Sequence, residues 1–132
     1  MEKVLEKYNI TSLKWDVALE KRLKNKRRLE SSGFKVYSQS DEDGIIEEIF
    51  KRVGTTNKVF VEFGVDNGIE SNSHYLLLKG WRGLWIEGSE DNVREIERLF
   101  RPAINKQNLK VSQNFINKDN INEIIRENSI SG

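Results

Sequence analysis

The sequence predicts an α/β fold in which helices flank a parallel sheet, and two patterns along the chain support this prediction. Three short apolar segments, at residues 58–64, 83–87 and 109–115, are each followed by a segment whose apolar residues recur every three or four positions. Nearly continuous apolar runs are typical of strands buried on both faces of a parallel sheet. Strands that alternate with helices are joined by right-handed crossovers, and the result is a doubly wound sheet.

The helix before the first strand is expected to begin at Ser40. Its hydroxyl would cap the free backbone N–H groups at the helix start, and Asp43 stands three residues later, where the acid of a capping box belongs. Gly54 is expected to end this helix. The inward-facing stripe would consist of Ile45, Ile46, Ile49, Phe50 and Val53.

Three further helices are expected between and after the strands. They cover residues 71–79, 91–100 and 119–127, and Gly80 and Pro102 are expected to end the first and the second. The inward-facing residues of the middle helix would be Val93, Ile96, Leu99 and Phe100. The core is expected to include Phe60, Trp81 and Trp85.

Residues 1–33 are expected to form a basic helical segment that precedes the sheet domain of residues 34–132. Residues 1–30 carry nine Lys and Arg against five Asp and Glu, whereas the whole chain has a net charge of only +1. The excess lies mostly in residues 21–28. Such a run can bind phosphates, so nucleic-acid binding stays open, but the favoured interpretation is the solvated face of a helix, because no aromatic stacking motif accompanies the run.

The composition excludes several kinds of site. The chain has 132 residues, enough for one domain, and no Cys, which excludes disulfides and Cys-ligated zinc and leads us to expect a cytoplasmic location. The single His, His74, cannot form a His-rich metal site. No apolar run approaches the roughly 18 residues that a membrane-spanning helix needs, and residues 1–10 lack the apolar block of a secretory signal.

The residues that predict a ligand site lie at the ends of the first two expected strands. Gly64 and Gly68 follow the first strand, and Glu87 closes the second. An open parallel sheet binds ligands beyond the carboxyl ends of its strands, and glycine lets the backbone approach a ligand closely. The two oxygens of Glu87 match the two adjacent hydroxyls of an adenosine ribose.

The glycine spacing favours one kind of adenosyl ligand over another. A dinucleotide site has the pattern G-x-G-x-x-G, but counted from Gly64 the second and third glycine positions are Asp66 and Ile69. A carboxylate in this turn would repel a pyrophosphate, and it would attract the amino group and the sulfonium of S-adenosylmethionine. A nicotinamide-dependent dehydrogenase is therefore disfavoured.

Several segments together resemble methyltransferases of the FkbM family over roughly residues 36–130. The segments are Tyr37–Gly44 (YSQSDEDG), Phe60–Gly68 (VEFGVDNG after Phe60), Ser71–Asn72 and Gly80–Ser89 (GWRGLWIEGS). The resemblance implies a Rossmann-like class I methyltransferase half-domain, with a parallel sheet of three strands in the order 3-2-1, preceded by N-terminal helices. It also implies an S-adenosylmethionine-dependent transfer of a methyl group, which we expect to go to a hydroxyl oxygen of a small molecule or glycan.

The same resemblance implies roles for individual residues. Gly64, Asp66 and Gly68 would cradle the cofactor with their backbone, Glu62 would lie at its methionine end and Glu87 at its ribose. The resemblance also implies that Gln39 and Asn72 lie near the methionine moiety. The family usually has a glycine where this chain has Asp66, so the turn is expected to be less open.

Members of the family continue into a fourth strand, where the acceptor wall and any general base would lie. No catalytic or metal-binding residue is therefore predicted, and little turnover is expected of residues 1–132 alone. In the expected strand order 3-2-1-4, the first strand would become an open edge that either invites a homo-oligomer or is covered by the basic N-terminal helices. A non-catalytic binding module with this fold remains an alternative.

Overall fold

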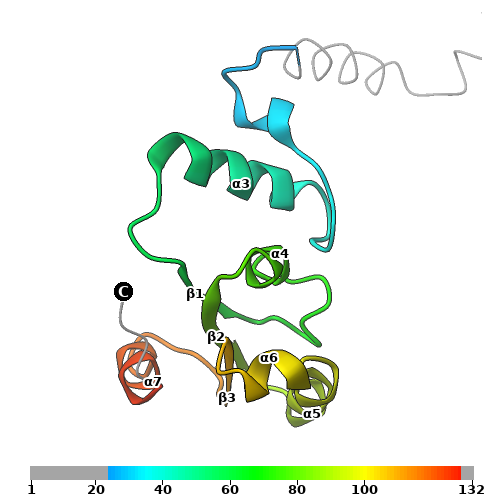
Figure 1. Ribbon diagram of the computed structural model, residues 1–132. Coiled ribbons are helices and arrows are strands. Elements are labelled where there is room, and N and C mark those ends of the chain that lie inside the picture. The colour runs from blue at the N-terminus through cyan, green and yellow to red at the C-terminus, as the bar shows by residue number, and fades with distance from the viewer. Residues whose placement is uncertain (1–23, 129–132) are drawn as a thin grey trace, which may run out of the picture.

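The computed structural model describes residues 24–128, and most of the basic helical segment expected at residues 1–33 lies outside the described residues. Its sheet has three strands, β1 (Val59–Phe63), β2 (Arg82–Glu87) and β3 (Leu109–Gln113). Both strand pairs are parallel and β2 lies in the middle, so the predicted parallel sheet and its strand order are confirmed (Figure 1).

Helices lie on both sides of this sheet (Figure 1). One face carries α4, α5 and α6, the opposite face carries α7, and α3 lies beyond α4. The elements are η1 (Leu29–Ser32), α3 (Glu42–Val53), α4 (His74–Leu78), α5 (Glu90–Leu99), α6 (Arg101–Asn105) and α7 (Ile121–Glu127). The predicted alternation of strands and helices is therefore present, although α4 and α7 are shorter than expected.

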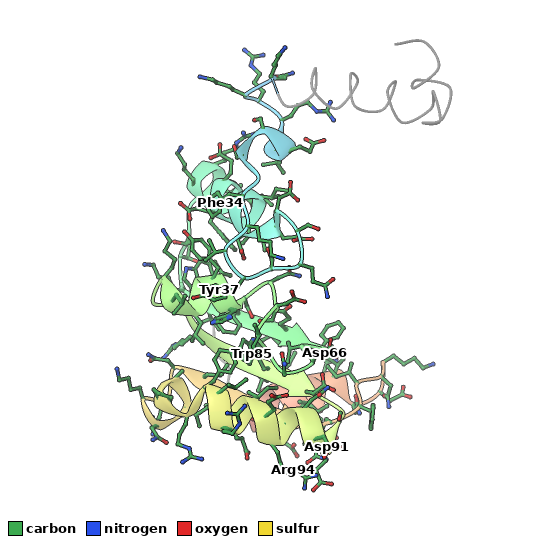
Figure 2. All side chains as sticks on the ribbon, turned by 90° about the vertical axis from the view of Figure 1, so that its right-hand side faces the viewer. Phe34, Tyr37, Asp66, Trp85, Asp91 and Arg94 are labelled. Carbon is green, nitrogen blue, oxygen red and sulfur yellow. The ribbon has the colours of Figure 1, made fainter. Side chains whose placement is uncertain are left out.

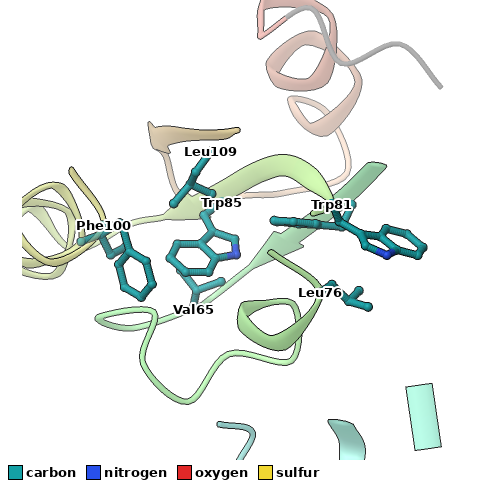
Figure 3. Close-up of a cluster of buried hydrophobic side chains, with 8 residues drawn as sticks. Val65, Leu76, Trp81, Trp85, Phe100 and Leu109 are labelled. Carbon is teal, nitrogen blue, oxygen red and sulfur yellow. The ribbon is translucent and has the colours of Figure 1, made fainter. Parts of the chain in front are cut away.

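The larger core lies between the sheet and the helices α4, α5 and α6. Trp85 is fully buried at its centre, and the ring of Phe100 meets it edge-on with the centroids 4.7 Å apart (Figure 3). Trp81 and Phe60 are also buried, at 7% and 8% exposure, so all three residues expected in the core are confirmed there. Large aromatic side chains contribute most of the buried apolar area in a core of this size.

The opposite face of the sheet is only partly covered. Leu84 and Ile86 of β2 pack there against Ile124 of α7. Val61 and Phe63 lie in register with these two β2 residues, and their side chains therefore share this face, but they are 38% and 59% exposed. Among residues 24–128, no strand pairs with the outer edge of β1.

The start of α3 differs from the expected capping box. The Ncap residue is Asp41, without a side-chain cap, and Ser40 donates its backbone N–H to Oε2 of Glu42 at 2.8 Å. The reciprocal pair is formed by Ser38 and Asp43 instead: the hydroxyl of Ser38 accepts the N–H of Asp43 at 3.3 Å, and the carboxylate of Asp43 accepts the N–H of Ser38 at 3.0 Å. The prediction was wrong because the chain before α3 folds back over the helix start.

Residues 24–28 of the basic segment are not helical, whereas residues 29–32 form the short 3-10 helix η1. Residues 24–28 form turns, in which Asn25 accepts the N–H of Arg27 on its side chain at 3.1 Å and the N–H of Arg28 on its carbonyl at 2.9 Å. Asn side chains compete with helix formation in this way. The guanidinium of Arg52 donates to the carbonyls of Arg27 and Lys26, at 2.6 and 3.1 Å, and joins this segment to α3.

Two residues that were expected to face inward, Val53 and Leu99, are exposed. Val53, at the last turn of α3, is 74% exposed, and Leu99 is 37% exposed because α5 ends there and α6 turns away. Pro102 lies in the first turn of α6, where its missing N–H costs no hydrogen bond. Pro102 therefore marks the start of α6, which follows directly after the end of α5.

Candidate functional site

The turn that follows β1 lies directly beside the end of β2. Gly64 donates its N–H to the carbonyl of Ile86 at 2.9 Å, and Asp66 donates its N–H to Oε2 of Glu87 at 3.0 Å. Oε1 of Glu87 accepts the N–H of Ser89 at 2.9 Å. Asp66 and Glu87 are therefore neighbours at the carboxyl edge of the sheet, as the sequence predicted.

Three residues in this turn have a positive φ: Gly64 at +67°, Asp66 at +51° and Gly68 at +82°. Aspartate is one of the few residues with a side chain that adopts this left-handed conformation at moderate cost. Asp66 therefore adopts a backbone conformation that glycine usually supplies. The turn closes sharply at this position without a glycine, and the side chain of Asp66 adds a carboxylate to the site.

Two pockets open on either side of Gly64. The first, the polar pocket, has a volume of about 250 Å³ and includes five of the seven predicted site residues. It is lined by Gln39, Glu42, Glu62, Gly64, Val65, Asp66, Asn67, Glu70, Ser71 and Asn72. The second, the apolar pocket, has a volume of about 260 Å³ and is lined by Phe63, Gly64, Ile86, Glu87, Gly88, Asn114, Phe115 and Ile116.

The polar pocket has a strongly negative lining. Four carboxylates (Glu42, Glu62, Asp66 and Glu70) contribute to it, and no Lys or Arg is among its lining residues. Hydrogen bonds from its own backbone N–H and that of Ser40 lower the pKa of Glu42, so this group is ionised at neutral pH. Nζ of Lys35 lies 3.9 Å from Oε1 of Glu70, and both side chains are exposed. A cationic group is therefore the ligand that this pocket favours.

Glu62 connects the pocket to the core. Its Oε1 accepts the N–H of Asn72 at 3.0 Å, and its Oε2 accepts the N–H and the hydroxyl of Ser73 at 2.8 and 2.5 Å. The hydroxyl of Ser73 in turn accepts Nε1–H of Trp85 at 2.7 Å. Three of about four acceptor positions on Glu62 are thus used within the protein, and one remains for a ligand.

The apolar pocket combines aromatic walls with one carboxylate. Phe63 and Phe115, which are 59% and 80% exposed, belong to its wall, and Ile86 and Ile116 line it as well. Glu87 is 8% exposed, and two of its roughly four acceptor positions hold the N–H groups of the adjoining turns. The remaining positions can accept two hydroxyl groups of a ligand.

The two glycines of the turn have different roles. An added Cβ at Gly64 would meet no atom within 4 Å, so this position faces open space between the pockets. An added Cβ at Gly68 would lie 2.4 Å from the ring of Trp85, and Gly68 lines neither of the two pockets. The structure thus places Gly68 in the packing around Trp85 and not in the expected backbone cradle.

Several lining residues were not among the predicted site residues. The segment after β3, Asn114–Ile116, reaches the apolar pocket because the third parallel strand ends at the same edge as the first two. The rule that ligands bind beyond the carboxyl ends of parallel strands, applied to the sequence, would have predicted this segment at the site. Glu42, in the first turn of α3, lines the polar pocket as well. Asn67 and Ser71 lie in segments that carry the family resemblance but were given no role, and Glu70 carries no sequence signal that separates it from ordinary loop residues.

Residues 24–128 contain no group of three or more His, Cys, Asp or Glu residues that could hold a metal ion. No helix within the described part of the chain is long and apolar enough to cross a membrane. Comparisons with models of protein families, with curated proteins and with solved structures found no match to this chain.

Proposed function

We propose that this chain binds S-adenosylmethionine across the polar and apolar pockets, as the cofactor-holding portion of a Rossmann-like class I methyltransferase of the FkbM type. The observation that carries the proposal is the position of Glu87. This carboxylate closes β2, accepts the N–H of Asp66 from the turn after β1, and stands where an acidic pocket and an aromatic-lined pocket meet at Gly64. The ligand would thus be cationic at one end and planar and apolar at the other.

Each part of the cofactor has a matching surface. The adenine would lie in the apolar pocket against Phe115, and the ribose hydroxyls would donate to the free acceptor positions of Glu87. The amino group and sulfonium would lie in the polar pocket, where Gln39, Asp66 and Asn72 line the wall with Glu62. A pyrophosphate would meet the four carboxylates of this pocket, which disfavours a dinucleotide.

The chain's own residues would bind and orient the cofactor. S-adenosylmethionine supplies a methyl group on a sulfonium, and transfer requires this carbon to lie in line with the acceptor atom. The turn at Gly64 has no side chain between the two pockets and leaves this space open. The acceptor would be a hydroxyl of a small molecule or a glycan, and no residue among 24–128 is assigned as its general base.

Calorimetric titration with S-adenosylhomocysteine tests the proposal, with NAD⁺ titrated in parallel as an adenosyl ligand that carries a pyrophosphate. We expect saturable one-site binding of S-adenosylhomocysteine and no binding of NAD⁺, because of the four carboxylates in the polar pocket. Binding of NAD⁺ alone, or of neither ligand, would refute the proposal.

A second candidate function, a non-catalytic binding or oligomerisation module, is favoured by the exposure of β1. The outer edge of β1 carries backbone groups without a strand partner among the described residues, and Val61 and Phe63 beside it are exposed. Such an edge is a template for pairing with another chain.

Light scattering tests this second candidate. We expect the wild type to form a dimer or a larger assembly and Val61→Lys to be monomeric, because a charge on the bare sheet face would be buried in the pairing. Val53→Lys is the matched control, since it adds the same charge at an exposed apolar position on α3, and its mass should equal that of the wild type. A wild-type monomer at every concentration would contradict pairing through β1.

A further inference from the structure

The carboxylate of Asp43 is the most deeply buried acidic group among the described residues. Its side chain is 1% exposed, although it lies in the first turn of α3. A single oxygen, Oδ2, accepts three successive backbone N–H groups, those of Val36 and Tyr37 at 2.7 Å and that of Ser38 at 3.0 Å. The other oxygen, Oδ1, is buried and has no hydrogen-bond partner within the described residues.

This arrangement is an anion site that the chain fills with its own side chain. Successive N–H groups that converge on one point form a concave site for negative charge. Burial by itself would raise the pKa of Asp43, but the hydrogen bonds from Tyr37, Val36 and Ser38 outweigh burial, and the pKa is lowered from its usual value. The group is therefore ionised at neutral pH, and the shape of residues 36–38 depends on that charge.

The segment that Asp43 holds continues directly into the wall of the polar pocket. Gln39 follows Ser38 and lines this pocket, and the carbonyl of Gln39 accepts Nζ–H of Lys35 at 3.0 Å. On the other side of Gln39, Ser40 donates its N–H to Glu42, which lines the same pocket. Two carboxylates from the first turn of α3 thus hold the backbone immediately before and after Gln39.

The segment of residues 36–38 also contacts the start of α4. The ring of Tyr37 stacks on His74 with the centroids 3.9 Å apart and the planes 30° apart. Figure 2 shows Tyr37 between the α3 layer, with Phe34, and the sheet layer that contains Trp85 and Asp66. Residues 36–39 therefore lie between α3 and the pocket, and Asp43 is the group that joins them to α3.

We propose that Asp43 is a positioning residue: its buried carboxylate fixes residues 36–38 and thereby presents Gln39 to the ligand in the polar pocket. Asp43 would not touch the ligand, because it is buried and does not line the pocket. The ligand-binding part rests on the proposed function, whereas the conformational part does not. Holding a contact residue in place before binding lowers the entropy lost on binding.

The experiment compares Asp43→Asn with Asp41→Asn. Both changes remove one negative charge at the start of α3, but Asp41 is exposed and its side chain caps no helix N–H group. NMR would measure amide exchange at residues 36–38 and the side-chain amide resonance of Gln39. In Asp43→Asn we expect exchange at these amides to be faster by about tenfold or more and the Gln39 resonance to shift, because charge-assisted hydrogen bonds are lost. Asp41→Asn should leave both unchanged.

A double-mutant cycle then tests whether Asp43 acts through Gln39. We expect Asp43→Asn and Gln39→Ala each to weaken binding of S-adenosylhomocysteine by about tenfold, and the double variant to be no weaker than either single variant. Additive losses would overturn the proposal, since a merely structural role for Asp43 would not depend on Gln39. Unchanged exchange at residues 36–38 in Asp43→Asn would overturn it as well.

Failure of the proposed function and failure of the positioning role of Asp43 can be distinguished. If the wild type does not bind S-adenosylhomocysteine, the proposed function fails, but amide exchange and the Gln39 resonance still decide whether Asp43 positions this segment. If Asp43→Asn does not fold, Ser38→Ala replaces it, because that change removes the hydroxyl that accepts the N–H of Asp43 and hydrogen-bonds to the carboxylates of Asp43 and Glu42, and it leaves the Asp43 carboxylate in place. We then expect a smaller increase in exchange at the same amides, and no increase would overturn the proposal.

Discussion

Replacing Glu87 with alanine is expected to weaken the binding of S-adenosylhomocysteine by about 100-fold or more, which calorimetry would register as a loss of measurable heat. Two hydrogen bonds from ribose hydroxyls to a carboxylate are each worth about 1.5–3 kcal/mol. The change also removes the acceptor of the N–H groups of Asp66 and Ser89, so the turns that form the site lose their connection. Both effects act in the same direction.

Two control variants separate these effects from a change of charge. Glu87→Gln keeps the shape and one acceptor oxygen, and we expect a loss between those of the wild type and Glu87→Ala. Glu90→Ala removes an exposed acid at the start of α5, three residues along the chain, and should bind like the wild type. Undiminished binding in Glu87→Ala would place the ligand away from the tip of β2 and would remove the basis of the proposed function.

Replacing Gly68 with alanine is expected to cause a large loss of stability. The new Cβ would lie 2.4 Å from the ring of Trp85 and 3.0 Å from that of Phe100, two buried aromatic side chains that cannot move aside easily. Gly68 also has a φ of +82°, which alanine tolerates poorly. We expect a loss of about 2–5 kcal/mol from overpacking and backbone strain together, measured by urea or thermal unfolding.

Gly64→Ala is the matched control for Gly68→Ala. Gly64 also has a positive φ, +67°, but an added Cβ there would meet nothing within 4 Å. Only the backbone strain of about 1–2 kcal/mol is expected in the free protein. Binding of S-adenosylhomocysteine should weaken strongly in Gly64→Ala, because the methyl group would lie between the two pockets. Equal losses of stability in the two variants would show that packing against Trp85 is not what requires glycine at position 68.

Much of the fold could be predicted because burial constrains the sequence locally. Nearly continuous apolar runs located β1 and β2 close to their observed bounds, although only β2 is buried on both faces. The meeting of Asp66 and Glu87 followed from parallel pairing, which brings consecutive strand ends to one edge. Helix ends were predicted less well, since the reciprocal hydrogen bonds before α3 involve Ser38 in place of Ser40.

The sequence by itself therefore determined the alternation of strands and helices and the acidic residues at the strand ends, because each depends on residues close together in the chain. Tertiary structure decided the rest. It placed Gly68 against Trp85, buried Asp43 under three backbone N–H groups, and brought Phe115 to the pocket of Glu87. These roles depend on distances between segments far apart in sequence or folded back on themselves, and no local pattern of residue types encodes such distances.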